Sequence, residues 1–348
     1  MEITQIHSGA KPIRWSFAQT HPVLAYLLVA FGWTWLFWLG AIPVRGQNDL
    51  LVMTMVLAGA YGPAIGCILT LGLRSGMTLD LSSKKMRAMF LASSLIFSVM
   101  VIRYFVGNVP GYASLPADLR ITAPVVLLAL VASLVGGWVI SSAFSQHHEI
   151  REKMASLLPA RLPWGWTLFA VLFFPALILA SWGIARLLGM EVEYPSGWGL
   201  SALNLIPLFL LSFVLTALAQ GGMEEPGWRG MLQPTLQNRL SPLAAALIVS
   251  LFWSLWHLPL YLNGFYPGDL VGGMVGGAIY RILLAIFLAW FYNRSGGNLF
   301  LMVFIHTCFN VMVDFLPASD LMMLALWLLI VVVIVLKDKM WRKLPLTA

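Results

Sequence analysis

The sequence predicts an all-α polytopic membrane protein, a bundle of about eight to ten transmembrane helices. Of its 348 residues, 60% are hydrophobic and only 10% are charged, whereas an average soluble domain carries about a quarter charged residues. Ten apolar runs are each close to the roughly 20 residues that a helix needs to cross the membrane. No polar stretch is long enough to enclose a water-facing core, so we predict a single membrane domain, 1–348.

The ten apolar runs follow one another along the whole chain, near 23–43, 51–73, 89–106, 123–144, 166–189, 200–220, 241–262, 272–292, 298–316 and 320–336. The first follows Lys11 and Arg14 as a signal peptide would, but it is long and lacks a convincing small-residue cleavage site. We therefore interpret it as an uncleaved span. Only residues 316–320 separate the last two runs, so one of that pair is a candidate re-entrant segment.

Basic residues segregate between alternate connections. With a cytoplasmic N-terminus, sixteen Lys and Arg residues fall on the cytoplasmic side and only Arg45 and Arg120 on the other. This bias follows the positive-inside rule, and an even number of spans then places both termini in the cytoplasm. The formal charge of +7 lies in short connections that meet lipid head groups, so we predict the bilayer as a partner and no nucleic acid.

The densest polar cluster directly follows the sixth run and contains Glu224, Glu225 and Arg229. On a helix Glu225 can pair with Arg229 four residues later, with the acid on the favourable N-terminal side. Glu224 points about 100° away around the axis and stays outside that pair. Beside apolar walls, such a free carboxylate is suited to act as a general base near neutral pH. An interfacial ion network that merely ends a helix is the alternative.

Two histidines lie inside later apolar runs. His257 is in the seventh run, and His306 is in the ninth, where Asn310 follows four residues later and faces the same way. Counted from the intervening turn, Glu225 and His257 are level on antiparallel neighbouring helices. His306 lies at a different depth unless the chain bends near Pro226.

Carboxylates, two histidines and an asparagine compose a hydrolytic site: a base for water, imidazoles that bind metal or donate hydrogen bonds, and an amide for an oxyanion. The serine-hydrolase elbow and the zinc-binding His-Glu-x-x-His are both missing from the sequence. His148 and Glu149 begin like the latter motif, but Glu152 stands where its second histidine should be. We interpret this segment as solvated surface.

These residues resemble three motifs of the CPBP intramembrane proteases, also called the CAAX-protease and bacteriocin-processing or Abi family. The motifs are Glu-Glu-x-x-x-Arg, aromatic-x-x-x-His and His-x-x-x-Asn, and they correspond here to 224–229, 253–257 and 306–310. The frequent Phe at the first position of the second motif is Trp253 in this chain. The resemblance covers about 200–316, the expected catalytic core. Residues 1–199 carry none of it and supply additional transmembrane helices.

By this resemblance Glu224 activates water with His257, while Glu225 and Arg229 hold the first motif in shape. The His and Asn of the third motif stabilise the tetrahedral oxyanion. The family is usually labelled metalloprotease, so zinc bound by the two histidines and a Glu stays open beside a metal-free, Glu-activated water. The resemblance implies an endopeptidase that cuts a membrane-associated peptide or protein near the cytoplasmic face of, for this bacterial-looking sequence, the plasma membrane.

Two other classes of function remain open. A transporter would use the buried Glu, Arg and His residues as a proton or ion path, but its polar residues should then occur in both halves of the chain. The first five runs offer almost none. A catalytically silent bacteriocin-immunity or scaffold protein on the same fold would keep every motif residue, and the sequence does not separate it from an enzyme.

Two further features outside the motifs require interpretation. Arg281 falls near the middle of the eighth run, where it either neutralises an acid of the site or pairs with backbone carbonyls or with an unrelated acid such as Asp314. Trp33, Trp35 and Trp38 of the first run are typical of an aromatic belt that faces lipid.

Overall fold

A computed structural model describes residues 13–77, 82–107, 121–158, 162–195, 197–266 and 268–344. Every regular element in these ranges is a helix, which confirms the all-α prediction. The described residues include nine helices long and apolar enough to cross a membrane, within the predicted range. Lys11, Arg120 and Arg161, which contributed to the charge count, lie outside the described residues.

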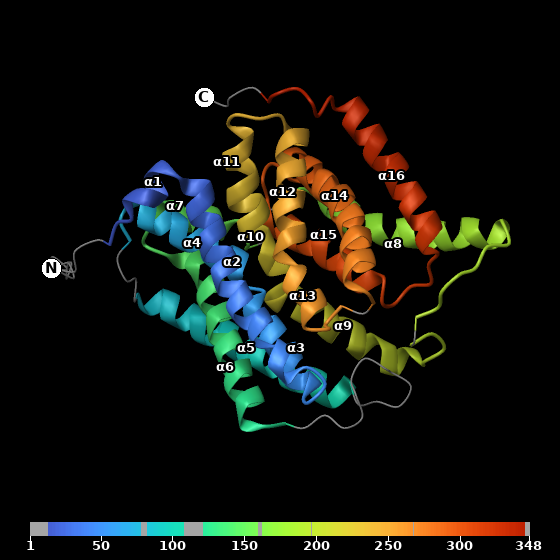
Figure 1. Cartoon of the computed structure of the whole chain (residues 1–348), viewed down its shortest axis with the longest axis horizontal. Coiled ribbons are helices and arrows are strands. Elements are labelled where there is room, and N and C mark those ends of the chain that lie inside the picture. The colour runs from blue at the N-terminus through green and yellow to red at the C-terminus, as the bar shows by residue number, and fades with distance from the viewer. Residues whose placement is uncertain are drawn as a thin grey trace.

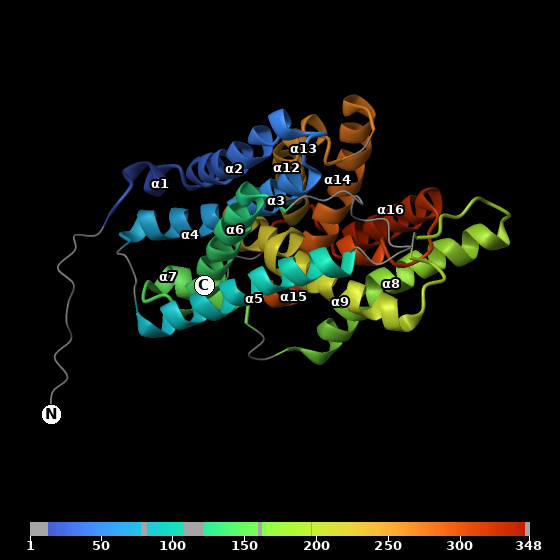
Figure 2. The ribbon, with the colours of Figure 1, turned by 90° about the horizontal axis from the view of Figure 1, so that it is seen from below.

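The helices fall into three groups in space. In Figure 1, α1 to α7 occupy one side of the molecule, α8, α9 and α16 extend on the other, and α10 to α15 lie between them; Figure 2 shows the same arrangement from below. The bounds are α1 (Ser16–Thr20), α2 (Pro22–Gly40), α3 (Asp49–Gly59), α4 (Gly62–Ser75), α5 (Ser83–Gly107), α6 (Ala123–Ser141), α7 (His148–Ala155), α8 (Trp164–Leu187), α9 (Ala202–Ala219), α10 (Glu225–Gly227), α11 (Gln233–Gln237), α12 (Pro242–Trp256), α13 (Leu258–Leu262), α14 (Leu270–Arg294), α15 (Leu299–Met312) and α16 (Asp320–Lys337).

The sixth predicted run does not end near residue 220. It continues as one apolar stretch, Ala202–Gln237, whose backbone leaves the α-helical form after α9. Gln220 adopts φ −139° and ψ −132°, a 3₁₀ turn η3 (Gly221–Glu224) follows, and a π-helical turn η4 (Trp228–Leu232) separates α10 from α11. Glycine and proline in this segment weaken the regular helix. The backbone thus departs from the helix at Gln220, earlier than the bend expected near Pro226.

The ninth predicted run is shorter than expected. Its helix α15 has 14 residues, about 21 Å by helical rise, which is less than the ~30 Å of a hydrocarbon core. It packs against α8, α9, η3, α10 and α14. A helix covered by protein on these sides does not have to match the thickness of the bilayer, so α15 can place its polar residues inside the bundle.

The interpretation of the first-run tryptophans as lipid-facing is wrong for Trp38, which is 1% exposed. Trp33 and Trp35 are half-buried, and their indole N–H groups donate to the carbonyls of Ala58 (2.9 Å) and Trp256 (3.2 Å). A buried indole N–H needs an acceptor, and these tryptophans find theirs on neighbouring helices. They therefore tie α2 to the rest of the bundle.

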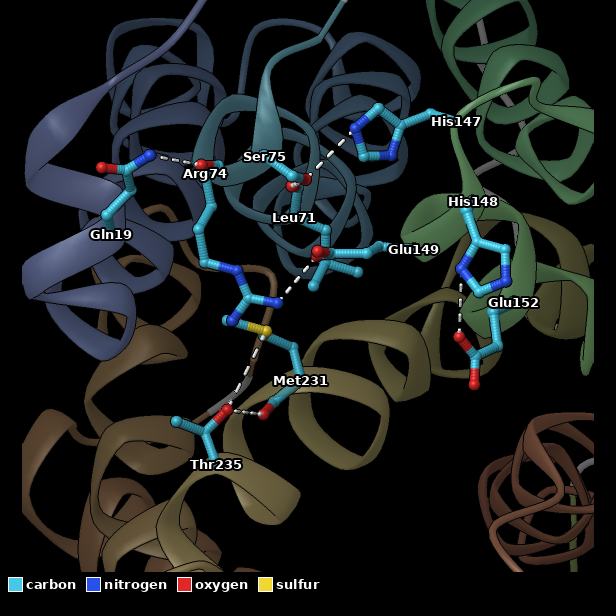
Figure 3. Close-up of polar contacts among 10 residues, drawn as sticks. All are labelled: Gln19, Leu71, Arg74, Ser75, His147, His148, Glu149, Glu152, Met231 and Thr235. Carbon is cyan, nitrogen blue, oxygen red and sulfur yellow. Dashed lines mark hydrogen bonds and ion pairs between the residues drawn. The ribbon is translucent and has the colours of Figure 1, made fainter.

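The His148 segment is solvated surface, as predicted. Figure 3 shows His148 facing Glu152 at the end of α7, and both side chains are more than 70% exposed with 3.5 Å between Nδ1 and Oε2. Glu149 instead accepts a hydrogen bond from Arg74 of α4 at 2.7 Å. This ion pair joins two helix ends and leaves nothing that resembles a zinc motif.

Candidate active site

Glu224 ends the turn η3 and is held through one carboxylate oxygen. Its Oε2 accepts hydrogen bonds from the indole N–H of Trp253 at 2.5 Å and of Trp228 at 3.3 Å. The residue is 6% exposed. Because both indole donors use Oε2, the other oxygen of Glu224 is left to bind a ligand or a water molecule.

Glu225 is the hub of a second set of contacts. Its Oε1 accepts from Arg229 Nη1 at 3.0 Å, which confirms the pairing predicted from the four-residue spacing. The same oxygen lies 2.6 Å from His306 Nδ1. This second contact could not be predicted from helical spacing, because the two residues are 81 positions apart. The carboxylate can only accept from the imidazole, or attract it as an ion pair, so Nδ1 of His306 carries a hydrogen.

His257 lies at the end of α12 with a defined ring orientation. Its Nδ1 is 2.7 Å from the carbonyl oxygen of Trp253. A carbonyl only accepts, so Nδ1 carries the hydrogen and the neutral ring presents the lone pair of Nε2. The ring packs edge-on against Trp256, with centroids 4.8 Å apart, and is stacked on Tyr266 at 6.1 Å and 16°.

Trp253 connects the two halves of the site, a role that the sequence analysis missed. Its N–H binds Glu224, its carbonyl binds His257, and its ring lies 4.5 Å below the Arg229 guanidinium. The edge of the ring also meets His306, with centroids 5.4 Å apart. A Phe at this position could supply the ring contacts but not the hydrogen bond to the carboxylate. The replacement of the family's frequent Phe by Trp253 was the one feature of the sequence that could have indicated this role.

His306 and Asn310 converge on Gly221. A Cβ added to Gly221 would lie 3.0 Å from His306 Nε2 and still closer to Asn310 Nδ2. Side chains three residues apart in a 3₁₀ turn share one side, so Gly221 and Glu224 belong to the same face of η3. The two nitrogens therefore meet the gap left by the missing side chain on the face that carries the carboxylate.

Two buried acids and two buried bases meet in the site. Glu224 and Glu225 are the two acids, and Arg229 and His306 are the bases that contact Glu225. Arg229 and Glu225 are both fully buried, yet Glu225 Oε2 and two nitrogens of Arg229 have no hydrogen-bond partner in the described structure. Such a network depends on charge compensation, because an isolated buried ion is strongly unfavourable.

A zinc ion held by His257, His306 and a Glu does not fit this arrangement. Each histidine donates from Nδ1, toward Trp253 or Glu225, as metal-binding histidines also do, so Nε2 of each ring is the nitrogen open to a metal. Across the described ranges no three His, Cys, Asp or Glu side chains are grouped so that they could share one ion. Catalytic zinc normally takes three protein ligands and a water. We therefore route no step through a metal.

Helices before residue 200 form part of the wall of the site. Trp38 packs on Trp256 with centroids 4.4 Å apart and reaches within 6.0 Å of the His257 ring. The hydroxyl of Tyr61 donates to the carbonyl of Leu218 at 2.8 Å, just before the break in α9. The N-terminal helices thus do more than anchor the chain in the membrane.

Comparisons with known proteins concern the same part of the chain. The family model described as type II CAAX prenyl endopeptidase Rce1-like matches residues 206–312, which include all six predicted site residues. The chain is 25% identical over 237 residues to CAAX prenyl protease 2 of Methanococcus maripaludis, a match that covers 64% of this chain and 83% of the archaeal protein. These similarities and the apolar helices support an integral membrane protease of the CAAX type. Residues 206–312 are thus similar to the Rce1-like domain of the CAAX prenyl endopeptidases.

Proposed function

We propose that the chain is an intramembrane endopeptidase that hydrolyses a peptide bond with water activated by Glu224 and His257. The observation that carries the proposal is the position of the candidate donors. His306 Nε2 and Asn310 Nδ2 meet at Gly221, on the face of η3 that also presents the Glu224 carboxylate. A base and two oxyanion donors around one gap are the parts that peptide hydrolysis needs.

In the first step Glu224 removes a proton from water. Two indole N–H groups fix its Oε2, so Oε1 is the oxygen that accepts the proton. Nε2 of His257 accepts a hydrogen bond from the same water and orients it, because its Nδ1–H is committed to the Trp253 carbonyl. The hydroxide then attacks the carbonyl carbon of the scissile bond.

In the second step the carbonyl oxygen becomes an oxyanion that His306 Nε2–H and Asn310 Nδ2–H stabilise. His306 donates from both nitrogens only as imidazolium, and its Nδ1 lies 2.6 Å from the Glu225 carboxylate. The tetrahedral intermediate collapses as the C–N bond breaks, and the Glu224 carboxylic acid returns its proton to the leaving amine. The products are a carboxylate and an amine.

The substrate is proposed to be a membrane-associated peptide or protein, cut near the cytoplasmic face. Arg229, counted among the cytoplasmic basic residues, is fully buried in the site, which leaves fifteen against two. The remaining bias still favours cytoplasmic termini.

Cysteine labelling tests this topology. Cysteines introduced for Ser83 and Lys337, two exposed positions, should react with an impermeant maleimide only from the cytoplasmic side. The native Cys67 and Cys308 are buried and should stay silent. Labelling of either cysteine from outside would show that this topology is wrong.

Glu224→Gln tests the chemistry. It keeps the side-chain shape and removes its basicity, so cleavage should fall by about 10²–10⁴-fold. Purified wild type and variant in liposomes would each receive prenylated C-terminal peptides, the class named by the archaeal relative, and a library of unmodified membrane peptides, with products read by mass spectrometry. Wild-type cleavage that the variant loses supports the proposal. Equal cleavage by both forms, or none by wild type, overturns it.

The same preparations test the metal. With two free imidazole nitrogens and no three-ligand group in the described chain, we expect activity to survive dialysis against a chelator. Elemental analysis should then find far less than one metal ion per chain. A stoichiometric metal that is lost in His306→Ala would require zinc bound through His257 and His306 instead.

The same preparations also separate the alternative functions. Flux of an ion without cleavage would favour a transporter. The absence of both flux and cleavage would favour a silent immunity protein.

A further inference from the structure

Arg281 of α14 is a buried cation that the proposed chemistry does not use. It lies about 16 Å by helical rise from the start of α14 and about 20 Å from its end. The residue is 8% exposed. Charged side chains in the middle of a membrane span are energetically costly and are retained where they pair or act. Its partners therefore have to be accounted for.

The partners that the structure provides are incomplete. Nη2 of Arg281 donates to the Tyr261 hydroxyl at 3.3 Å, which is long for such a bond, and Nη1 is buried without any acceptor. No Asp or Glu of the described chain forms an ion pair with it. Asp314, the alternative acid considered from the sequence, instead lies within the electrostatic reach of Arg103. Arg281 thus has no anionic partner among the described residues, and an anionic ligand would supply one.

The guanidinium lies beside the proposed catalytic residues. Tyr261 follows His257 by four residues, and Tyr266 is stacked on the His257 ring and packs edge-on against Tyr261 at 5.0 Å. Burial raises the pKa of Tyr266 to about 12, while the charge of Arg281 acts in the opposite direction. Two half-buried tyrosines therefore link His257 to Arg281.

Arg281 and Tyr261 together fill the place of the side chain that Gly277 lacks. A Cβ on Gly277, one turn earlier on α14, would lie 2.7 Å from Arg281 Nη1. The Tyr261 hydroxyl reaches the same position. A carboxylate that displaced this hydroxyl would exchange one long neutral hydrogen bond for two charge-assisted bonds in the fork geometry that arginine favours.

We propose that Arg281 is the specificity residue that binds a carboxylate of the substrate, next to the proposed catalytic His257. That the bound molecule is a substrate rests on the proposed function, whereas the binding of a carboxylate by Arg281 does not. The carboxylate is either the C-terminal group of the peptide or an acidic side chain close to the cleaved bond. Arg281 does not contact the reacting atoms, so it selects the substrate and does not perform the chemistry.

Binding is measured in the Glu224→Gln background, where no probe is cut, in nanodiscs of one fixed lipid composition. Three probes are used: N-acetyl-Ala-Leu-Leu-Leu with a C-terminal carboxylate, the same peptide as a carboxamide, and a carboxamide with Glu at the third position. We expect at least one carboxylate probe to bind tenfold or more tightly than the neutral carboxamide. The carboxylate probe with the higher affinity identifies the source of the anion, either the C-terminal carboxylate or the Glu side chain.

Arg281→Gln should bind all three probes equally, and Arg281→Lys should keep part of the preference because it keeps the charge without the fork. Tyr261→Phe should keep the preference in full, since it removes only the competing hydroxyl. Arg294→Gln is the matched control: it lies on the same helix, but its guanidinium is satisfied by Asp338 at 2.5 Å. A preference that persists in Arg281→Gln, or that is absent from the Glu224→Gln parent, overturns the proposal even where cleavage itself is established.

Discussion

Removal of the charge of Glu225 should reveal how the site is held together. Glu225→Gln keeps an oxygen that can accept from Arg229 and His306, but it leaves the fully buried Arg229 without a compensating charge. Breaking a buried pair in this way costs about 3–5 kcal/mol. Since every 1.4 kcal/mol is a factor of ten, the unfolding equilibrium should shift by about 10²–10⁴-fold. Activity should fall as well, because His306 loses the carboxylate that holds its Nδ1.

A double variant separates the two effects. In Glu225→Gln with Arg229→Met both charges are gone, and replacement of a buried ion pair by an apolar group is often neutral or stabilising. We therefore expect the double variant to recover most of the stability that Glu225→Gln loses. It should not recover activity, because His306 still lacks its carboxylate. Arg229→Met alone leaves Glu225 in contact with His306. Its stability should lie between that of Glu225→Gln and that of the double variant.

The assay is denaturant unfolding in mixed micelles, followed by tryptophan fluorescence, together with peptide cleavage by the same preparations. Glu224→Gln is the matched control for the loss of one adjacent carboxylate, and it should be stable but inactive. If Glu225→Gln is as stable as wild type, or if the double variant is no more stable than Glu225→Gln, then uncompensated burial of Arg229 does not explain the role of Glu225.

Two smaller perturbations test the surroundings of the reacting groups. Trp253→Phe keeps the ring but removes the 2.5 Å hydrogen bond to Glu224. A hydrogen bond to a charged group contributes about 1.5–3 kcal/mol to stability, so the free energy of unfolding should fall by up to that amount. Because Glu224 is then no longer held in place, kcat/KM should drop about 10- to 150-fold, and an unchanged kcat/KM would refute this role. Gly221→Ala places a Cβ against His306 and Asn310, and a displacement of about 1 Å costs on the order of 10²-fold in kcat. A variant that retains full kcat would show that these donors do not act at Gly221.

Local pairs in the site could be predicted from the sequence because helical spacing fixes them. Glu225 and Arg229 are four residues apart, and they do form the expected pair at 3.0 Å. The separation of Glu224 from that pair also follows from the angular step of a helix, and Glu224 indeed binds Trp228 and Trp253 instead. In each case the relevant geometry extends over a single turn, where the backbone alone decides which side chains meet.

Contacts between distant segments could not be predicted, because they depend on how the backbone departs from a regular helix. The link between Glu225 and His306 requires the break at Gln220, and a sequence that contains two glycines and a proline indicates a bend without giving its direction. Trp38 was misread for a similar reason. An aromatic residue in a first span is usually near lipid, and only the packing of α2 on α12 and α13 shows that this ring lies beside Trp256.

The irregular backbone itself explains why a catalytic core of about 200–316 carries so many additional helices. In lipid, backbone N–H and C=O groups that leave the helical pattern must be shielded by protein or water. All residues of η3, α10 and η4 are buried, including Gly227, whose missing side chain lets α10 approach Pro63 of α4 closely. A Cβ there would lie 2.5 Å from the Pro63 carbonyl oxygen. The N-terminal helices thus cover the broken segment, and a fragment that contained only the core would expose to lipid the backbone that positions Glu224.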